Sequence, residues 1–150
     1  MENIFKTEVN QGITDRINKL TPETKMLWGK MDVAQMLAHC NVTYEMVYTD
    51  KHPKISGVKK FFVKLLVKPL VTGNKPYKKN THTAPQFIIL EKKNFEEEKT
   101  RLIGYLQKTQ ELGESYFEGL ESLSFGNLSA SEWNMMFYKH LDHHLNQFGV

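Results

Sequence analysis

The fold is indicated most clearly by residues 129–149, whose sequence is SASEWNMMFYKHLDHHLNQFG. Its first four residues form a Ser-x-x-Glu capping box, in which both side chains bond to free backbone N–H groups at a helix start. The apolar residues that follow recur every three or four positions, and Gly149 is typical of the position just beyond a helix end. The stretch predicts a long amphipathic helix from Ser129 to about Gln147.

Three further long helices are predicted from the same periodicity, over residues 7–20, 32–48 and 94–112. The second starts at a capping arrangement of Asp32 with Gln35, and the third is expected to end at Gly113. Glu97 and Arg101 are four residues apart on this third helix, a spacing that favours an ion pair.

The segment between the second and third of these helices is rich in turn-forming residues. Within it, residues 58–70 have apolar and lysine positions on opposite helical faces and predict one short helix, which we expect Pro69 to end. No alternating strand pattern longer than residues 87–90 is present. The sequence therefore predicts a single all-α domain over residues 1–150: a four-helix bundle with an extra short helix and a long connection between its second and third helices.

Composition narrows the functional classes. The 150 residues are 40% hydrophobic and 25% charged, the ordinary balance of one globular domain. No secretory signal pattern opens the sequence, and the single Cys40 fits a reducing compartment, so we expect a cytoplasmic protein. The longest apolar run, residues 87–90, is far short of the roughly 20 residues that span a bilayer. The net charge is only +3, and the lysines concentrate between residues 51 and 79. Neither a nucleic acid nor a membrane is therefore expected as a partner.

Two histidines of the last predicted helix fall on its apolar face. On a helical wheel at about 100° per residue, His140 and His144 lie within the apolar stripe and His143 lies at its edge. Their spacing is that of the histidine pair in His-Glu-x-x-His enzymes, although leucine follows His140 instead of glutamate. His39 points inward from the second helix, which completes a set of three imidazoles with room for an exogenous fourth ligand.

The sequence therefore predicts one divalent metal ion at His39, His140 and His144. The alternative is that the three histidines are hydrogen-bonded core residues. Burying three imidazoles without a shared partner, however, costs the free energy of desolvation once for each ring. Three imidazoles suit zinc or nickel, with iron and copper as alternatives. His82 lies in a predicted loop and is the residue best able to close the site, although an exposed loop histidine is the favoured interpretation.

Three residues are predicted to surround the ligands. Gln35 and Thr43 lie one turn before and one turn after His39, and Gln147 lies near the face of His144. Capping for Gln35 and solvation for Gln147 are the alternatives. Asp142 is predicted to face solvent, so no catalytic base is identified.

Three motifs resemble one known family: WGKM at 28–31, QMLAHC at 35–40 and YKHLDHHLNQFG at 138–149. Over nearly its whole length the chain resembles the DinB-like superfamily, in a branch catalogued as a domain of unknown function. The resemblance implies an up-down-down-up four-helix bundle, often dimeric. It also implies a metal held by one histidine of the second helix and a His-x-x-x-His pair of the last, positions that fall on His39, His140 and His144. Relatives include thiol-dependent S-transferases and a maleylpyruvate isomerase. The resemblance therefore implies which residues form the site, but it does not select one reaction.

The leading hypothesis is a metal-dependent transferase or hydrolase, whose ion activates a thiol or water against a small electrophile. The expected substrate is a small molecule, such as a low-molecular-weight thiol. The alternative is a non-catalytic bundle in which the ion is structural. A third hypothesis is that the predicted helix over residues 58–70 binds a membrane surface or a protein partner. The favoured interpretation is that the apolar side of this helix packs over the bundle or at a homodimer contact.

Overall fold

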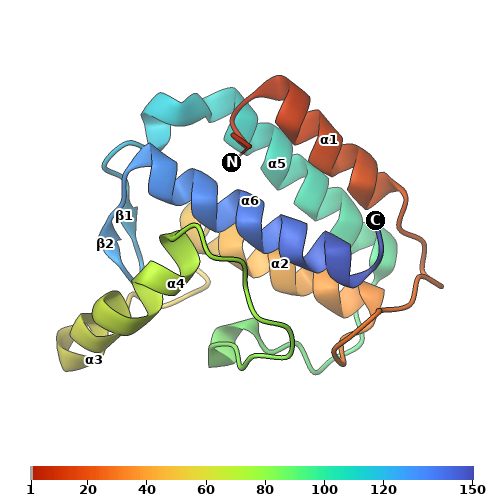
Figure 1. Cartoon of the computed structure of the whole chain (residues 1–150), viewed down its shortest axis with the longest axis horizontal. Helices are drawn as coiled ribbons and strands as arrows, with labels where there is room; N and C mark the ends of the chain where they lie inside the picture. Colours follow the sequence, from red (N-terminus) through yellow and green to blue (C-terminus); the bar gives the residue numbers. More distant parts are fainter. Residues whose placement is uncertain (1) are drawn as a thin grey trace.

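The computed structural model describes residues 2–150 and is mostly helical (Figure 1). Its long helices are α1 (Thr7–Asn18), α2 (Val33–Tyr48), α5 (Phe95–Phe117) and α6 (Ala130–Gln147). α5 packs against the other three, and α6 also packs against α1 and α2. The only sheet within residues 2–150 is a small antiparallel pair, β1 (Glu121–Ser122) with β2 (Gly126–Asn127), in the loop before α6. The predicted helical class is confirmed, and none of the described helices combines the length and the apolar character that crossing a membrane would need.

Helix starts follow the predicted caps. The Asp32 side chain accepts a hydrogen bond from the backbone N–H of Gln35, and the Gln35 side chain accepts one from that of Asp32. Ser129 and Glu132 form the same reciprocal pair at α6, and Asn94 caps α5 with a single bond. These contacts satisfy backbone donors that a helix leaves free at its first turn. The predicted starts of these three capped helices are confirmed.

The end of α5 differs from the prediction. Gly113 has a φ of 70° and a ψ of 173°, a combination that is essentially restricted to glycine, but the chain then resumes helical geometry to Phe117. Phe117 is fully buried, and its ring centroid lies 5.0 Å from that of Phe5 and 5.6 Å from that of Phe137. Burial of this ring holds the extra turn, so Gly113 kinks the helix and does not end it.

The predicted ion pair between Glu97 and Arg101 is also absent from the described residues. Arg101 bonds instead to Glu98, at 2.7 Å, and to Glu45 of α2. Glu45 is largely buried, and its carboxylate attracts the guanidinium across the interface between α2 and α5.

Aromatic stacking sets the rotation of α6. Phe137 is fully buried and stacks on Tyr44 of α2, with ring centroids 4.8 Å apart, and on Trp133, with centroids 5.4 Å apart. Residues three and seven positions after Phe137 lie on the same face of a helix. His140 and His144 are therefore turned toward α2.

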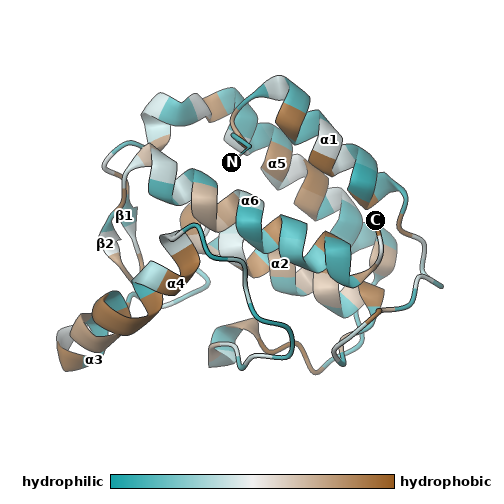
Figure 2. Ribbon diagram, in the orientation of Figure 1, coloured by the Kyte–Doolittle hydropathy of each residue, from teal (hydrophilic) through white to brown (hydrophobic). Residues whose placement is uncertain are grey.

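The connection between α2 and α5 begins with a helical arm, defined here as residues 57–72. It consists of α3 (Gly57–Phe62), a π-helical stretch η1 (Val63–Val67) and α4 (Lys68–Thr72), and it extends away from the long helices (Figure 1). Pro69 does not end it, because the π-helical stretch leaves this proline in the first turn of α4, where its missing N–H is not needed. The expectation that its apolar side packs over the bundle is wrong, because the large apolar side chains of the arm are exposed. Figure 2 shows their hydrophobic character in the brown ribbon of α3.

Candidate metal centre

The three predicted histidines converge between α2 and α6. One ring nitrogen from each of His39, His140 and His144 lies within 4.8 Å of the others, and the Nε2 atoms of His39 and His140 are 3.0 Å apart. His39 and His144 are buried and His140 is partly buried. Imidazoles bound to one zinc ion at about 2.0–2.1 Å place their nitrogens roughly 3–3.4 Å from one another. The 3.0 Å between His39 and His140 falls in this range, whereas the 4.8 Å limit for the set of three is wider.

A backbone carbonyl orients His39. Its Nδ1 lies 2.8 Å from the carbonyl oxygen of Phe87, in the short 3-10 helix η2 (Pro85–Phe87) of the connection. A carbonyl oxygen can only accept, so Nδ1 carries the proton and Nε2 carries a lone pair. This is the arrangement by which proteins commonly hold a metal-binding histidine.

A carboxamide orients His144 in the same way. Oε1 of Gln147 lies 2.8 Å from His144 Nδ1, and Nε2 of Gln147 donates to the carbonyl oxygen of Trp28, also at 2.8 Å. The bond to Trp28 fixes which end of the amide faces the imidazole, so His144 donates through Nδ1 and keeps a lone pair on Nε2. The structure places Gln147 beside His144 with its side chain buried, which overturns the alternative of simple solvation.

His140 meets a group that can either donate or accept. Its Nδ1 lies 3.1 Å from the hydroxyl of Thr43, which the structure thus places beside the histidine cluster. With no cation present, the hydroxyl can donate to Nδ1 while His140 donates through Nε2 to His39. With a cation present, the hydroxyl can accept from Nδ1, which leaves a lone pair on Nε2. Thr43 therefore permits the tautomer in which Nε2 of every one of the three rings carries a lone pair.

Burial keeps these rings neutral. Desolvation lowers the pKa of His144 to about 3 and also lowers the pKa values of His39 and His140; for His140 the neighbouring imidazoles add to the effect. Neutral imidazole is the form that binds metal. Within residues 2–150, no carboxylate or thiol joins the cluster, so the protein itself would leave the charge of a bound cation uncompensated.

Other residues singled out in the sequence lie outside the cluster. The hydrogen bonds of Gln35 go to the Asp32 cap and to the carbonyl of Glu91, and none goes to the three histidines. His82 is exposed and does not belong to the cluster. Burial raises the pKa of the Cys40 thiol, which faces the sulfur of Met36, so Cys40 has the features of a structural residue.

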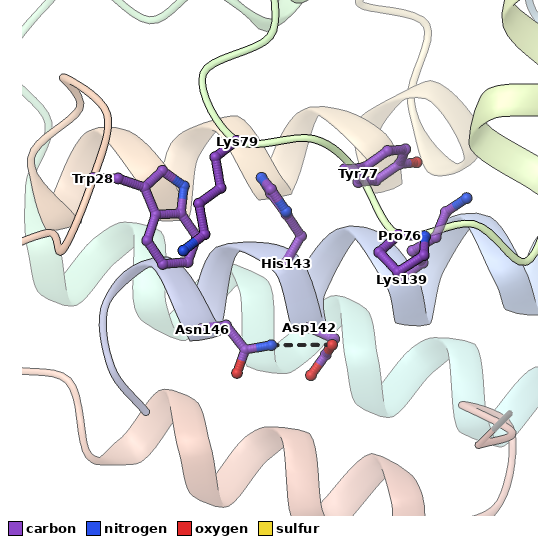
Figure 3. Close-up of a pocket in the computed structure, with 8 residues that line it drawn as sticks. All are labelled: Trp28, Pro76, Tyr77, Lys79, Lys139, Asp142, His143 and Asn146. Atoms are coloured by element: carbon purple, nitrogen blue, oxygen red, sulfur yellow. Dashed lines mark hydrogen bonds between the residues drawn. The ribbon is translucent and has the colours of Figure 1, made fainter.

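A cleft of about 330 Å³ lies beside the cluster, between α6 and the coil that follows the arm (Figure 3). Its lining residues are Trp28, Pro76, Tyr77, Lys79, Lys139, Asp142, His143 and Asn146. None of the three clustered histidines lines it. The side chain of His143 points up between Trp28 and Tyr77 (Figure 3), and the ring of Tyr77 relates the cleft to the cluster, because its centroid lies 5.6 Å from that of His143 and 6.4 Å from that of His140.

The charges in the cleft are unequally compensated. Asp142 pairs with Arg16 at 2.8 Å and does not simply face solvent as predicted. The ammonium of Lys139 donates to three backbone carbonyls. Lys79 lies 4.0 Å above the ring of Trp28 and has no ion pair within the described chain, so it supplies the free positive charge.

Sequence reasoning did not find Tyr77, Lys79 or the carbonyl of Phe87. All three lie in the turn-rich connection, where no periodic pattern shows which side chains point inward. A backbone carbonyl moreover has no residue-specific signal.

Comparison with known proteins gives one match. A family model described as "Protein of unknown function (DUF1569)" matches residues 6–149, and the chain therefore belongs to this family. No curated protein and no solved structure matches it. The family agrees with the predicted branch of unknown function, while membership of the wider DinB-like superfamily stays a prediction.

Proposed function

We propose that this chain, a member of the DUF1569 family, binds one divalent metal ion through Nε2 of His39, His140 and His144 and uses it to activate a thiol or a water molecule against a small electrophile. The observation that carries the proposal is that Nδ1 of every ring is engaged by an oxygen atom, which leaves the three Nε2 atoms for one shared partner. Without such a partner, the only contact given among the three Nε2 atoms is the one between His39 and His140, which compensates part of the desolvation of the three rings.

An ion bound to three neutral imidazoles keeps its charge and lowers the pKa of a coordinated water or thiol. The donor set suits zinc or nickel, with iron and copper as alternatives. The protein's part is to hold the rings. Phe87, Thr43 and Gln147 fix their orientation, and α2 and α6 bury them. No fourth protein ligand belongs to the cluster among residues 2–150, so the remaining position suits an exogenous molecule.

The cleft beside Tyr77 is the proposed entrance for a small-molecule substrate, such as a low-molecular-weight thiol. Its volume is near the lower end of the roughly 300–1,000 Å³ usual for ligand sites. The uncompensated ammonium of Lys79 above Trp28 favours a substrate with a negative group next to a flat or apolar part.

The proposal extends to the architecture and location. We assign α1, α2, α5 and α6 to a DinB-like four-helix bundle acting in the cytoplasm. A second candidate function is structural, because the same three histidines join α2 to α6 and an ion there would stabilise the folded state.

The test is the metal content of the protein purified without chelators. Wild type and His82→Ala, a control at an exposed histidine, should each carry about one equivalent of metal, and His140→Ala should lose nearly all of it. Wild type that stays empty after incubation with zinc and with nickel, or His140→Ala that loads like wild type, contradicts the proposal. Cobalt substitution separates the two functions: a visible spectrum that changes on addition of a thiol or azide supports an open position, and an unresponsive spectrum supports a structural ion.

A further inference from the structure

The helical arm carries most of the large apolar side chains that the described chain exposes. Seven of the eleven belong to it: Val58, Phe61, Phe62, Leu65, Leu66, Val67 and Leu70. Their positions recur at intervals of three and four residues, so most lie on one side of the helix. A contiguous apolar surface of this kind marks an interaction site.

The opposite side of the arm is anchored to the rest of the protein. Lys60 pairs with Glu121 at 3.3 Å, and Lys68 pairs with Glu132 at 2.7 Å. Between and beyond these lysines, Val63 and Val71 are partly buried against the core. The ion pairs and the valines therefore fix the arm with its apolar side turned away from its own chain.

We propose that this apolar side is a dimerisation surface and that its partner is the arm of a second copy of this chain. Seven apolar side chains, most of them more than half exposed, offer on the order of 700 Å², close to the roughly 800 Å² per partner of a specific interface. In a dimer with a two-fold axis, both chains contribute the same patch, so both surfaces of the interface are apolar. The three-and-four spacing supplies the ridges by which two helices interlock.

The distribution of charge favours a second copy over an anionic lipid surface. A membrane-bound amphipathic helix needs lysines free to reach lipid headgroups beside its apolar face. Here Lys60 and Lys68 are paired with glutamates of their own chain, and only Lys59 and Lys64 of the arm have no ion pair within residues 2–150. Two facing arms bring these like charges together, so added salt should strengthen the dimer, whereas salt weakens binding to anionic lipid.

Sedimentation velocity over a range of protein and salt concentrations tests the proposal. Wild type should sediment as a dimer, more completely at higher salt, and Leu65→Glu should raise the dissociation constant by at least about 100-fold, because it buries an unpaired charge in the contact. Leu90→Glu, at a leucine 85% exposed outside the arm, is the matched control and should remain dimeric. Far-ultraviolet circular dichroism should be the same for all three proteins.

Two outcomes overturn the proposal. Wild type can be monomeric at every concentration and salt, or Leu65→Glu can dimerise like wild type, which would place the contact elsewhere. A monomeric wild type that floats with phosphatidylglycerol vesicles and not with phosphatidylcholine vesicles would assign the arm to lipid.

Discussion

The carboxamide of Gln147 joins His144 to the carbonyl oxygen of Trp28, with both hydrogen bonds at 2.8 Å. The residue after Trp28 lies against this amide so closely that a Cβ atom on Gly29 would collide with Nε2 of Gln147. Gly29 also has a backbone φ of +90°, which side chains disfavour. The loop before α2 and the end of α6 are thus fitted to each other around one imidazole.

Replacing Gln147 by leucine should weaken metal binding by about 10- to 100-fold, because His144 loses the acceptor that fixes its tautomer. Gly29→Ala should act in the same direction by displacing the amide. Competition with a chromophoric chelator measures both affinities, and Gln11→Leu, at an exposed glutamine of α1, is the control. An affinity of Gln147→Leu equal to that of the control would show that the amide has no part in metal binding.

Replacing Thr43 by valine keeps the shape of the side chain and removes the hydroxyl that faces His140. We expect about a 10-fold loss of metal affinity, because Nδ1 of His140 then has no acceptor when Nε2 is needed for the ion. Thr43→Ser retains the hydroxyl and should bind like wild type. Nitrogen chemical shifts of the His140 ring in the metal-loaded protein report the tautomer directly, and equal affinities for the valine and serine variants would contradict the assigned role.

Glu45 should make stability depend on pH. Burial alone would raise the pKa of its carboxyl, but hydrogen bonds from Lys51 and His52 and the charge of Arg101 outweigh burial and lower the pKa below its ordinary value of 4.5. A lowered folded-state pKa adds stability above the unfolded-state value, and this stability is lost as the pH falls through the folded-state value. Glu45→Gln should therefore cost about 1–3 kcal/mol at pH 7, with the difference from wild type shrinking below about pH 4.5.

Urea unfolding at a series of pH values checks this expectation. Glu111→Gln, at an exposed glutamate of α5, should leave the free energy of unfolding within about 0.5 kcal/mol of wild type. A difference between wild type and Glu45→Gln that stays constant from pH 7 to pH 3 would exclude ionisation of Glu45 as its cause.

Lys139 should hold the end of the arm in place. Its ammonium donates to the carbonyl oxygens of Leu70, Gly73 and Lys75 at 2.7, 2.6 and 3.2 Å, and no other group within residues 2–150 bonds to all three. Lys139→Met retains the length of the side chain and removes these bonds, so the segment after the arm should open more often. Trypsin, which does not cleave the bond between Lys75 and Pro76, should then cleave faster after Lys78, as mass spectrometry of the fragments would show.

The control for this variant is Lys19→Met, at an exposed lysine that follows α1. It should leave the tryptic pattern of residues 70–80 unchanged. Equal cleavage rates for the two variants would mean that the segment is held by other contacts.

Helix starts and the rotation of α6 could be predicted because both are local properties. Ser129 needs only its own neighbours to form a cap, and the fixed helical period decides that His140 and His144 share a face while His143 lies beside it. The end of α5 could not be predicted this way, since the burial of Phe117 among distant aromatic rings outweighs the local signal of Gly113.

Contacts between side chains that lie far apart in the sequence could not be predicted, for the same reason. The pairing of Arg101 with Glu45 joins two helices, and nothing in either helix alone indicates it. The amphipathic pattern of the arm correctly indicated a helix with two faces. Periodicity does not decide which face is covered, and here the pairing of Lys60 and Lys68 with glutamates covers the basic one.

Lys139 also bears on how far the chain could be shortened. A deletion of the arm and the coil after it would remove all three acceptors of the Lys139 ammonium together with the ring of Tyr77 that covers it, one residue from His140. The connection between α2 and α5 is therefore not an insertion that can be trimmed independently. We expect a natural or designed version of this protein with a shorter connection to tolerate residues other than lysine at position 139, because the acceptors that the ammonium serves are then gone.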